Sequence, residues 1–176
     1  MTPPTKKSCT PPSTILATNA PLSIVLVEPR IPQNTGNISR LCACTGVDLF
    51  LVGDLGFRLS DKLLKRSGMD YMDRVTPIHL QSFEALTEEK PGWQPVYLST
   101  KATQSHWEYT YQPNSLLVFG SETQGLPEWV ITENPGHSVR IPMAEGARSL
   151  NLASSTAIVL YEALRQINTS QRELLI

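Results

Sequence analysis

Residues 34–40 read Asn-Thr-Gly-Asn-Ile-Ser-Arg and gather side chains that could bind an anion or a nucleotide. Amide side chains both donate and accept hydrogen bonds, and Arg40 presents an always-charged planar fork that suits phosphate. The segment follows an apolar run at 24–27 and leads into a helical pattern that ends at Gly46. Because open α/β sheets bind ligands where their strands end, the segment predicts a site for an anionic or nucleotide substrate.

A second candidate loop begins at Gly120, where the apolar run at 115–119 ends. Glycine lets a backbone approach a ligand closely, and Glu122 places a carboxylate at the mouth of the same turn. The glycine spacing is that of a phosphate loop, but Leu-Pro at 126–127 replaces the required Lys and Ser or Thr. ATP or GTP binding by that motif is therefore excluded. An ordinary turn that leads into a helix explains this loop equally well.

A third loop, residues 141–152, again joins a predicted strand to a predicted helix. Ser149 can cap the final helix by accepting an amide hydrogen bond, and a simple cap is a strong alternative to a functional loop. Asn151 argues for function, because it is expected in the first helical turn, where propensity favours Ala or Glu. The loop adds both residues to the candidate site.

A fourth segment, residues 58–74, mixes basic and acidic side chains with an aromatic one. Lys62, Lys65 and Arg66 share one face of a predicted helix, and Tyr71 follows them. Such a face can contact the phosphates of a nucleic acid. On this pattern alone, a solvated helix face is the better interpretation.

The composition limits the classes of protein to which the chain can belong. Its 176 residues suffice for one domain with a full core, and its net charge of −1 means that nucleic-acid binding needs a local basic patch. Cys9, Cys42 and Cys44 form no disulfide framework, which favours a reducing compartment, the cytoplasm. The histidines lack metal-ligand spacing, and no apolar run is long enough to cross a membrane. We therefore expect neither a metal nor a membrane partner.

Strand and helix patterns alternate across residues 22–176, after a Pro-rich extension at 1–21 that is too polar to bury a core and is expected to be disordered. Strands are predicted at 23–27, 49–52, 96–99, 115–119 and 138–141. Helices are predicted at 35–45, 60–66, 82–89, 127–132 and 150–167. The strands are continuously apolar, which is typical of burial on both faces. We predict an α/β fold with a mostly parallel sheet flanked by helices.

Taken in order, the three loops resemble the three motifs of the SPOUT class of RNA 2′-O-methyltransferases. The matching patterns are Asn34-x-Gly36-Asn37-x-x-Arg40, Phe119-Gly120-x-Glu122-x-x-Gly125-Leu126, and residues 141–143 with 149–152. Within the class, the chain is similar to the small tRNA (cytidine/uridine-2′-O-)-methyltransferases of the wobble nucleotide, the TrmL type. This closer similarity lies in the segments 28–38, 40–43, 56–57, 61–62, 68–71 and 161–163. The resemblance covers residues 23–167.

The resemblance implies a C-terminal trefoil knot, a homodimer, and S-adenosyl-L-methionine held in the knot. By position, the cofactor would contact Leu98, Gly120, Ile141 and Ser149. The implied reaction is 2′-O-methylation of the wobble cytidine or uridine in the anticodon stem-loop of tRNA, with leucine isoacceptors as the expected substrates. The RNA-binding residues would be Lys62, Lys65, Arg66 and Tyr71.

The same resemblance implies a catalytic set of Arg40, Asn34, Glu122 and Asn151. The family proposal makes the motif arginine the general base, but a guanidinium stays protonated and has no acceptor. We therefore expect Arg40 to bind the adjacent phosphate and to stabilise the developing alkoxide. Asn34 would orient the ribose or Arg40, and Glu122 would hold the cofactor loop or complement positive charge. Ser149 and Asn151 would fix the cofactor's carboxylate end or the substrate hydroxyl.

Two other functions stay open at this point. One is the same chemistry at another tRNA site or on ribosomal RNA, and the other is a non-catalytic RNA-binding dimer. Gln124, Ala102 and Ser154 depart from residues that are common among the relatives, which bears on fine substrate preference. The intact motif residues argue against a loss of catalysis, and the short chain favours a tRNA stem-loop over a large ribosomal substrate.

Overall fold

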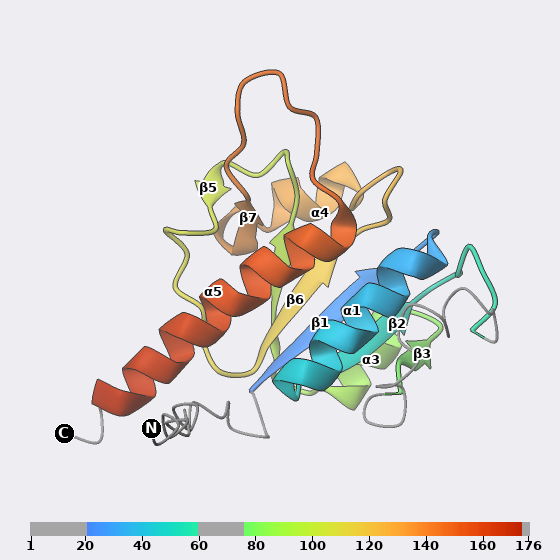
Figure 1. Ribbon diagram of the computed structural model, residues 1–176, viewed down its shortest axis with the longest axis horizontal. Helices are drawn as coiled ribbons and strands as arrows, with labels where there is room; N and C mark the ends of the chain where they lie inside the picture. Colours follow the sequence, from blue (N-terminus) through green and yellow to red (C-terminus); the bar gives the residue numbers. More distant parts are fainter. Residues whose placement is uncertain (1–20, 60–75, 174–176) are drawn as a thin grey trace, which may run out of the picture.

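The structure is a computed structural model that describes residues 21–59 and 76–173. The described residues form a seven-stranded sheet in the order β3-β2-β1-β6-β4-β7-β5, in which all neighbouring strands are parallel (Figure 1). The strands are β1 (Leu22–Val27), β2 (Asp48–Val52), β3 (Ile78–Leu80), β4 (Gln94–Leu98), β5 (Gln104–Ser105), β6 (Ser115–Phe119) and β7 (Ser138–Arg140). The predicted fold class is confirmed.

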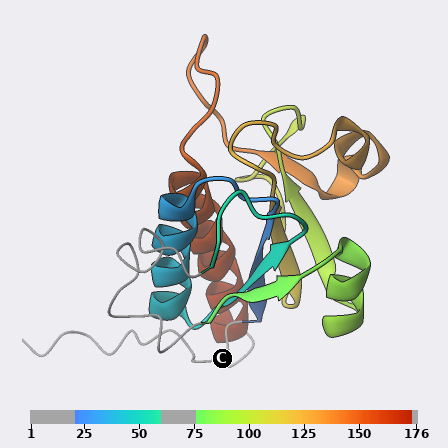
Figure 2. The same cartoon turned by 90° about the vertical axis from the view of Figure 1, so that its right-hand side faces the viewer.

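Helices cover both faces of this sheet (Figure 2). They are α1 (Pro32–Thr45), α3 (Phe83–Glu89), α4 (Glu128–Glu133), the short 3-10 helix η1 (Pro135–His137) and α5 (Leu152–Glu173). In β1, Ile24 and Leu26 pack in the core beneath α1 and α5, whereas Val25 packs in the core beneath α3 and α4. Successive strand residues point to opposite faces, so two buried faces require the continuous apolar run seen in the sequence.

The element boundaries differ from the prediction in ways that local chemistry explains. Helix α1 begins at Pro32, three residues earlier than predicted, because the fixed φ of proline suits the first helical turn. It ends at Thr45 and is followed by Gly46, whose φ of 70° is the left-handed conformation that glycine adopts without strain. The prediction missed β3 and β5, which are three and two residues long and carry no recognisable apolar run.

The cap of α5 corrects a prediction. Asn151, rather than Ser149, caps this helix. The Asn151 side-chain oxygen accepts hydrogen bonds from the backbone amides of Ala153 and Ser154, at 2.9 and 3.3 Å. Asn151 therefore precedes the helix instead of lying in its first turn, and Ser149 lies in the loop before it. Asparagine is among the best N-cap residues, so the cap itself explains part of why Asn151 is there.

Strand β7 lies between β4 and β5, which are consecutive in sequence. Residues 97–98 of β4 pair with β7 on one side, and β5 pairs with it on the other. The chain thus returns to fill a place between two strands that it formed earlier. Knots are exceptions to ordinary chain threading, and the trefoil knot stays a prediction from the resemblance.

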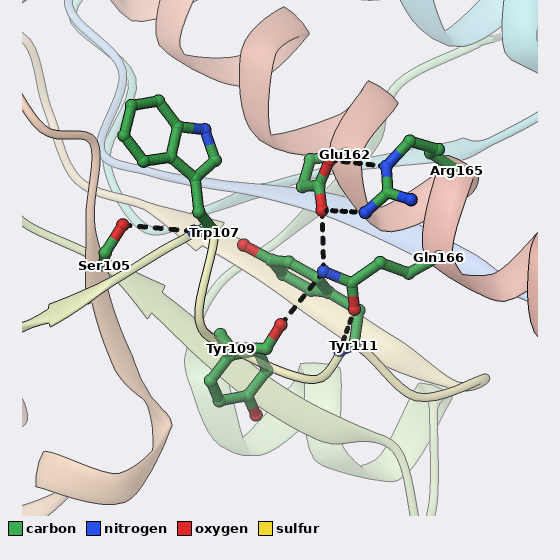
Figure 3. A network of polar contacts seen from close by, with 7 residues as sticks. All are labelled: Ser105, Trp107, Tyr109, Tyr111, Glu162, Arg165 and Gln166. Atoms are coloured by element: carbon green, nitrogen blue, oxygen red, sulfur yellow. Dashed lines mark hydrogen bonds and ion pairs between the residues drawn. The ribbon is translucent and has the colours of Figure 1, made fainter.

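A side-chain amide ties the segment between β5 and β6 to helix α5 (Figure 3). The Gln166 amide nitrogen donates to the backbone oxygen of Tyr109 at 3.1 Å, and its oxygen accepts from the backbone amide of Tyr111 at 3.1 Å. Glu162 accepts a second bond from the same nitrogen at 2.7 Å and two from Arg165. This network fixes the segment that leads into the central strand β6.

Acidification below about pH 6.5 is expected to destabilise the fold through His106. This side chain is 1% exposed, and within the described residues neither of its buried ring nitrogens has a hydrogen-bond partner. Desolvation therefore lowers the pKa of His106 from its ordinary value of 6.5, although the backbone of Arg140 and the charge of Glu162 oppose the shift. In this pH range His106 is protonated in the unfolded chain but stays neutral in the folded chain. The free energy of unfolding therefore falls as pH falls from 6.5 toward the pKa of His106 in the folded protein.

Urea denaturation at pH 7.5 and 5.5 measures this effect, and His106→Leu should flatten the difference. His79→Leu is the matched control, because His79 is exposed and bonds the backbone oxygen of Gly53. An unchanged pH dependence in His106→Leu would show that other groups carry the acid sensitivity.

Candidate active site

A cavity of about 480 Å³ lies at the carboxyl ends of β4, β6 and β7. Seven of the predicted site residues line it, and these are Asn34, Leu98, Gly120, Glu122, Ile141, Ser149 and Asn151. They are up to 117 residues apart in sequence. The parallel sheet brings them together because its strands all end on the same edge.

Gly120 has no room for a side chain. A Cβ atom built on it would lie 2.0 Å from the backbone carbon of Gly125 and 2.2 Å from the backbone nitrogen of Leu126. The turn after β6 folds back onto its own start, where Ser121 and Gly125 form an isolated bridge. The sequence predicts a close backbone approach at Gly120, and the approach seen here is that of the loop itself. This tight turn sets the shape of the cavity wall.

The Glu122 carboxylate joins the loop after β6 to the start of α1. It accepts hydrogen bonds from the backbone amide of Arg30 at 2.8 Å and from that of Ile31 at 3.3 Å. Helix α1 has no acidic residue in its first turn and no side-chain cap of its own. Glu122 thus supplies a negative charge at the positive end of this helix. The contact connects the loops that follow two neighbouring strands, β1 and β6, at the point where the order of the strands reverses.

Asn34 continues this chain of hydrogen bonds to the third loop. Its amide nitrogen donates to Glu122 at 2.9 Å, and its amide oxygen accepts from the Asn151 side chain at 2.9 Å. Asn34 is 6% exposed. Since Asn151 also caps α5, one line of bonds connects the starts of two helices with the turn after β6. The three predicted loops are therefore one hydrogen-bonded unit.

Arg40 lies apart from this hydrogen-bonded unit and from the cavity. It is exposed on α1, and it is not among the described residues that line the cavity. Arg40 comes six positions after Asn34, which corresponds to about 9 Å along a helix. The predicted RNA-binding residues lie outside the described part of the chain, and these are Lys62, Lys65, Arg66 and Tyr71. The structure thus gathers the predicted cofactor residues but not the predicted arginine.

Several cavity residues were not predicted from the sequence. Ile31 precedes Asn34, and Thr100 follows β4. Lys101, also in the lining, directly precedes Ala102, one of the departures from the relatives. Its ammonium donates to Glu128 at 2.7 Å, and this hydrogen bond, with the positive charge behind it, lowers the pKa of the Glu128 carboxyl. Thr100 and Lys101 lie two and three residues after the end of β4, so the rule that sites gather at carboxyl ends of strands predicts them.

Comparison with known proteins places this fold and site in one family. Residues 21–161 match the model of the SpoU rRNA Methylase family, and the chain belongs to that family. A tRNA (cytidine(34)-2′-O)-methyltransferase of Yersinia pestis is 44% identical over 152 residues, which are 83% of this chain and 94% of the relative. The protein of that name from Escherichia coli (strain K12) is 42% identical over 147 residues, 83% of this chain and 94% of its own.

Solved structures agree with these relatives. One that is described as giving structural insights into the 2-OH methylation of C/U34 on tRNA superposes with a TM-score of 0.79 at 40% identity. It is matched over 84% of this chain and 97% of its own. An AdoMet-bound rRNA methyltransferase from Sinorhizobium meliloti has a TM-score of 0.73 at 27% identity, over 82% of this chain and 56% of its own.

Proposed function

We propose that this protein is an S-adenosyl-L-methionine-dependent methyltransferase that acts on the 2′-hydroxyl of nucleotide 34, cytidine or uridine, in tRNA. The observation that carries the proposal is the bonded unit of Asn34, Glu122 and Asn151 at one end of a cavity. The relatives at 42–47% identity carry the name of this activity. Leucine tRNAs are the proposed isoacceptors, and a tRNA substrate fits the cytoplasmic location that cysteine usage favours.

The cavity suits an adenosyl cofactor. Leu98, Ile141 and Leu152 offer apolar contacts for a base, and Gly120 also lines the cavity. The volume lies within the range of about 300–1,000 Å³ that is typical of small-molecule sites. Bound S-adenosylmethionine would supply an activated methyl group on sulfur. We propose that Leu98, Gly120, Ile141 and Ser149 hold it.

The protein's own residues would mainly position the reacting groups and stabilise charge. The ribose 2′-oxygen must lie in line with the methyl group, and fixing that geometry contributes much of the rate. Asn34 is held from both sides, so it is oriented before the substrate arrives, and it is suited to orient the ribose. Arg40 lies outside the cavity, so we propose that it binds a phosphate of the tRNA backbone.

The activity is tested by mapping 2′-O-methyl groups in tRNA incubated with the protein and S-adenosylmethionine. Methylation at nucleotide 34 is expected, and methylation elsewhere in tRNA or in rRNA would replace this proposal by the same chemistry at another site.

Arg40→Lys keeps the positive charge but loses the planar guanidinium that can bind phosphate with two hydrogen bonds, and it should lower kcat/KM about tenfold. If Arg40→Lys methylates as fast as the natural protein, the proposed phosphate role is wrong.

A homodimer is proposed through the outer face of α5, beside α1. Ile158 and Tyr161 lie on that face, 41% and 52% exposed, on a helix whose opposite side is core. Figure 2 shows α1 and α5 side by side, and Arg40 is exposed on α1. A two-fold interface uses the same patch on both protomers. Light scattering at micromolar concentration should give twice the mass of 19.5 kDa, and Ile158→Asp should lower it to one chain.

RNA contact by Lys62, Lys65, Arg66 and Tyr71 is also a proposal, supported by the charge pattern and by the family. Neutralising one of these side chains should reduce the slope of the logarithm of the tRNA-binding constant against the logarithm of salt concentration by about one.

Within the described residues, no helix is long and apolar enough to cross a membrane, and no three His, Cys, Asp or Glu side chains are grouped as metal ligands would be.

A further inference from the structure

The cavity lining holds only two charged side chains among the described residues, one of each sign. Among the described residues that line it, Lys101 is the only one with a cationic side chain and Glu122 the only one with an anionic side chain. The other lining residues are apolar, hydroxyl, amide or glycine. A ligand that carries its own negative charge would therefore find a single cation in the cavity wall.

Glu122 forms no ion pair with Lys101 among the described residues. Its two carboxylate oxygens are already bound by the backbone amides of Arg30 and Ile31 and by the Asn34 side chain. These three donors belong to the start of α1. These hydrogen bonds hold Glu122 against the start of α1, and Lys101 forms its ion pair with a different carboxylate.

A carboxylate outside the cavity forms an ion pair with Lys101 and orients its side chain. Its ammonium nitrogen lies 2.7 Å from a carboxylate oxygen of Glu128, which opens α4 and is not part of the cavity lining. The Lys101 backbone amide donates to the Ser99 hydroxyl at 3.2 Å, which fixes the start of the side chain. An ammonium has three N–H donors, so one can stay with Glu128 while the others serve a ligand in the cavity.

We propose that Lys101 binds the α-carboxylate of S-adenosylmethionine and makes the site selective for a cofactor with an intact amino-acid end. The inference rests on the proposed function and deepens it. Ser149 and Asn151 would otherwise have to hold this carboxylate, but the Asn151 side chain is engaged by Asn34 and by the α5 amides. A hydrogen bond from the Lys101 ammonium to the cofactor carboxylate would be charge-assisted and therefore stronger than one from a neutral donor.

The test compares the binding of S-adenosylmethionine with that of decarboxylated S-adenosylmethionine, which lacks only the carboxylate. Isothermal titration calorimetry is done with the natural protein, with Lys101→Met and with Glu128→Gln. The natural protein should prefer the intact cofactor by about tenfold. Lys101→Met should lose that preference by weakening only the intact cofactor. Glu128→Gln keeps an acceptor for Lys101 and removes the competing charge, so it should keep the preference.

Three outcomes would overturn the inference. One is a natural protein that binds both molecules equally, and another is a Lys101→Met variant that keeps the preference or loses affinity for both molecules alike. The third is unchanged cofactor binding with a raised KM for tRNA, which would assign Lys101 to an RNA phosphate. Failure of the natural protein to bind S-adenosylmethionine at all would instead count against the proposed function.

Discussion

Gly120→Ala is expected to weaken cofactor binding and methyl transfer strongly while leaving a folded sheet. The added Cβ would lie 2.0–2.3 Å from three backbone atoms of Gly125 and Leu126, and backbone cannot rotate away as a side chain can. The turn after β6 must open, and with it the wall of the cavity. Overpacking typically costs about 1–3 kcal/mol. Because this clash is with backbone, we expect a weakening of S-adenosylmethionine binding of about a hundredfold or more.

The controls separate this clash from a general effect of removing glycine. Gly136→Ala has open space around its Cβ and should behave like the natural protein in calorimetry and activity. Gly125→Ala also has open space, but its φ of 68° is strained for alanine, which costs about 1–2 kcal/mol. It should be intermediate. If Gly120→Ala binds the cofactor normally, the tight turn does not set the shape of the site.

Glu122→Gln is expected to lower kcat at least about tenfold and to reduce stability by about 1 kcal/mol. The substitution keeps the shape but replaces one acceptor oxygen by an N–H₂ group. That group then faces a donor, either the Asn34 amide or a backbone N–H of the α1 start. The negative charge at the α1 N-terminus is lost as well. Because Asn34 loses its orientation, turnover should suffer more than cofactor affinity.

Single-turnover methylation and cofactor titration measure the two effects separately. Glu88→Gln, an exposed change on α3, is the matched control and should alter neither. A double-mutant cycle with Asn34→Ala should give a coupling energy of about 1 kcal/mol, because the two side chains share a hydrogen bond. Additive losses would mean that Glu122 acts independently of Asn34.

Much of the fold could be predicted from local patterns. Five of the seven strands come from apolar runs, and their continuity indicates burial on both faces. The prediction missed β3 and β5 because strands of three and two residues are too short to show a periodic pattern. The cap of α5 was assigned to Ser149 rather than Asn151, because several loop residues in a row can each cap a helix and only the backbone path selects one.

Local sequence patterns define which residue types stand at the ends of which strands, and therefore the class of fold and a candidate set of site residues. How these residues act together depends on tertiary packing. Asn34, Glu122 and Asn151 meet across separations of 88 and 117 residues, and Arg40 falls outside the cavity although it shares a motif with Asn34. Packing decides these contacts because a hydrogen bond needs atoms about 3 Å apart. Local sequence sets the direction of a side chain along its own helix or strand, whereas the packing of distant strands sets which partner it reaches.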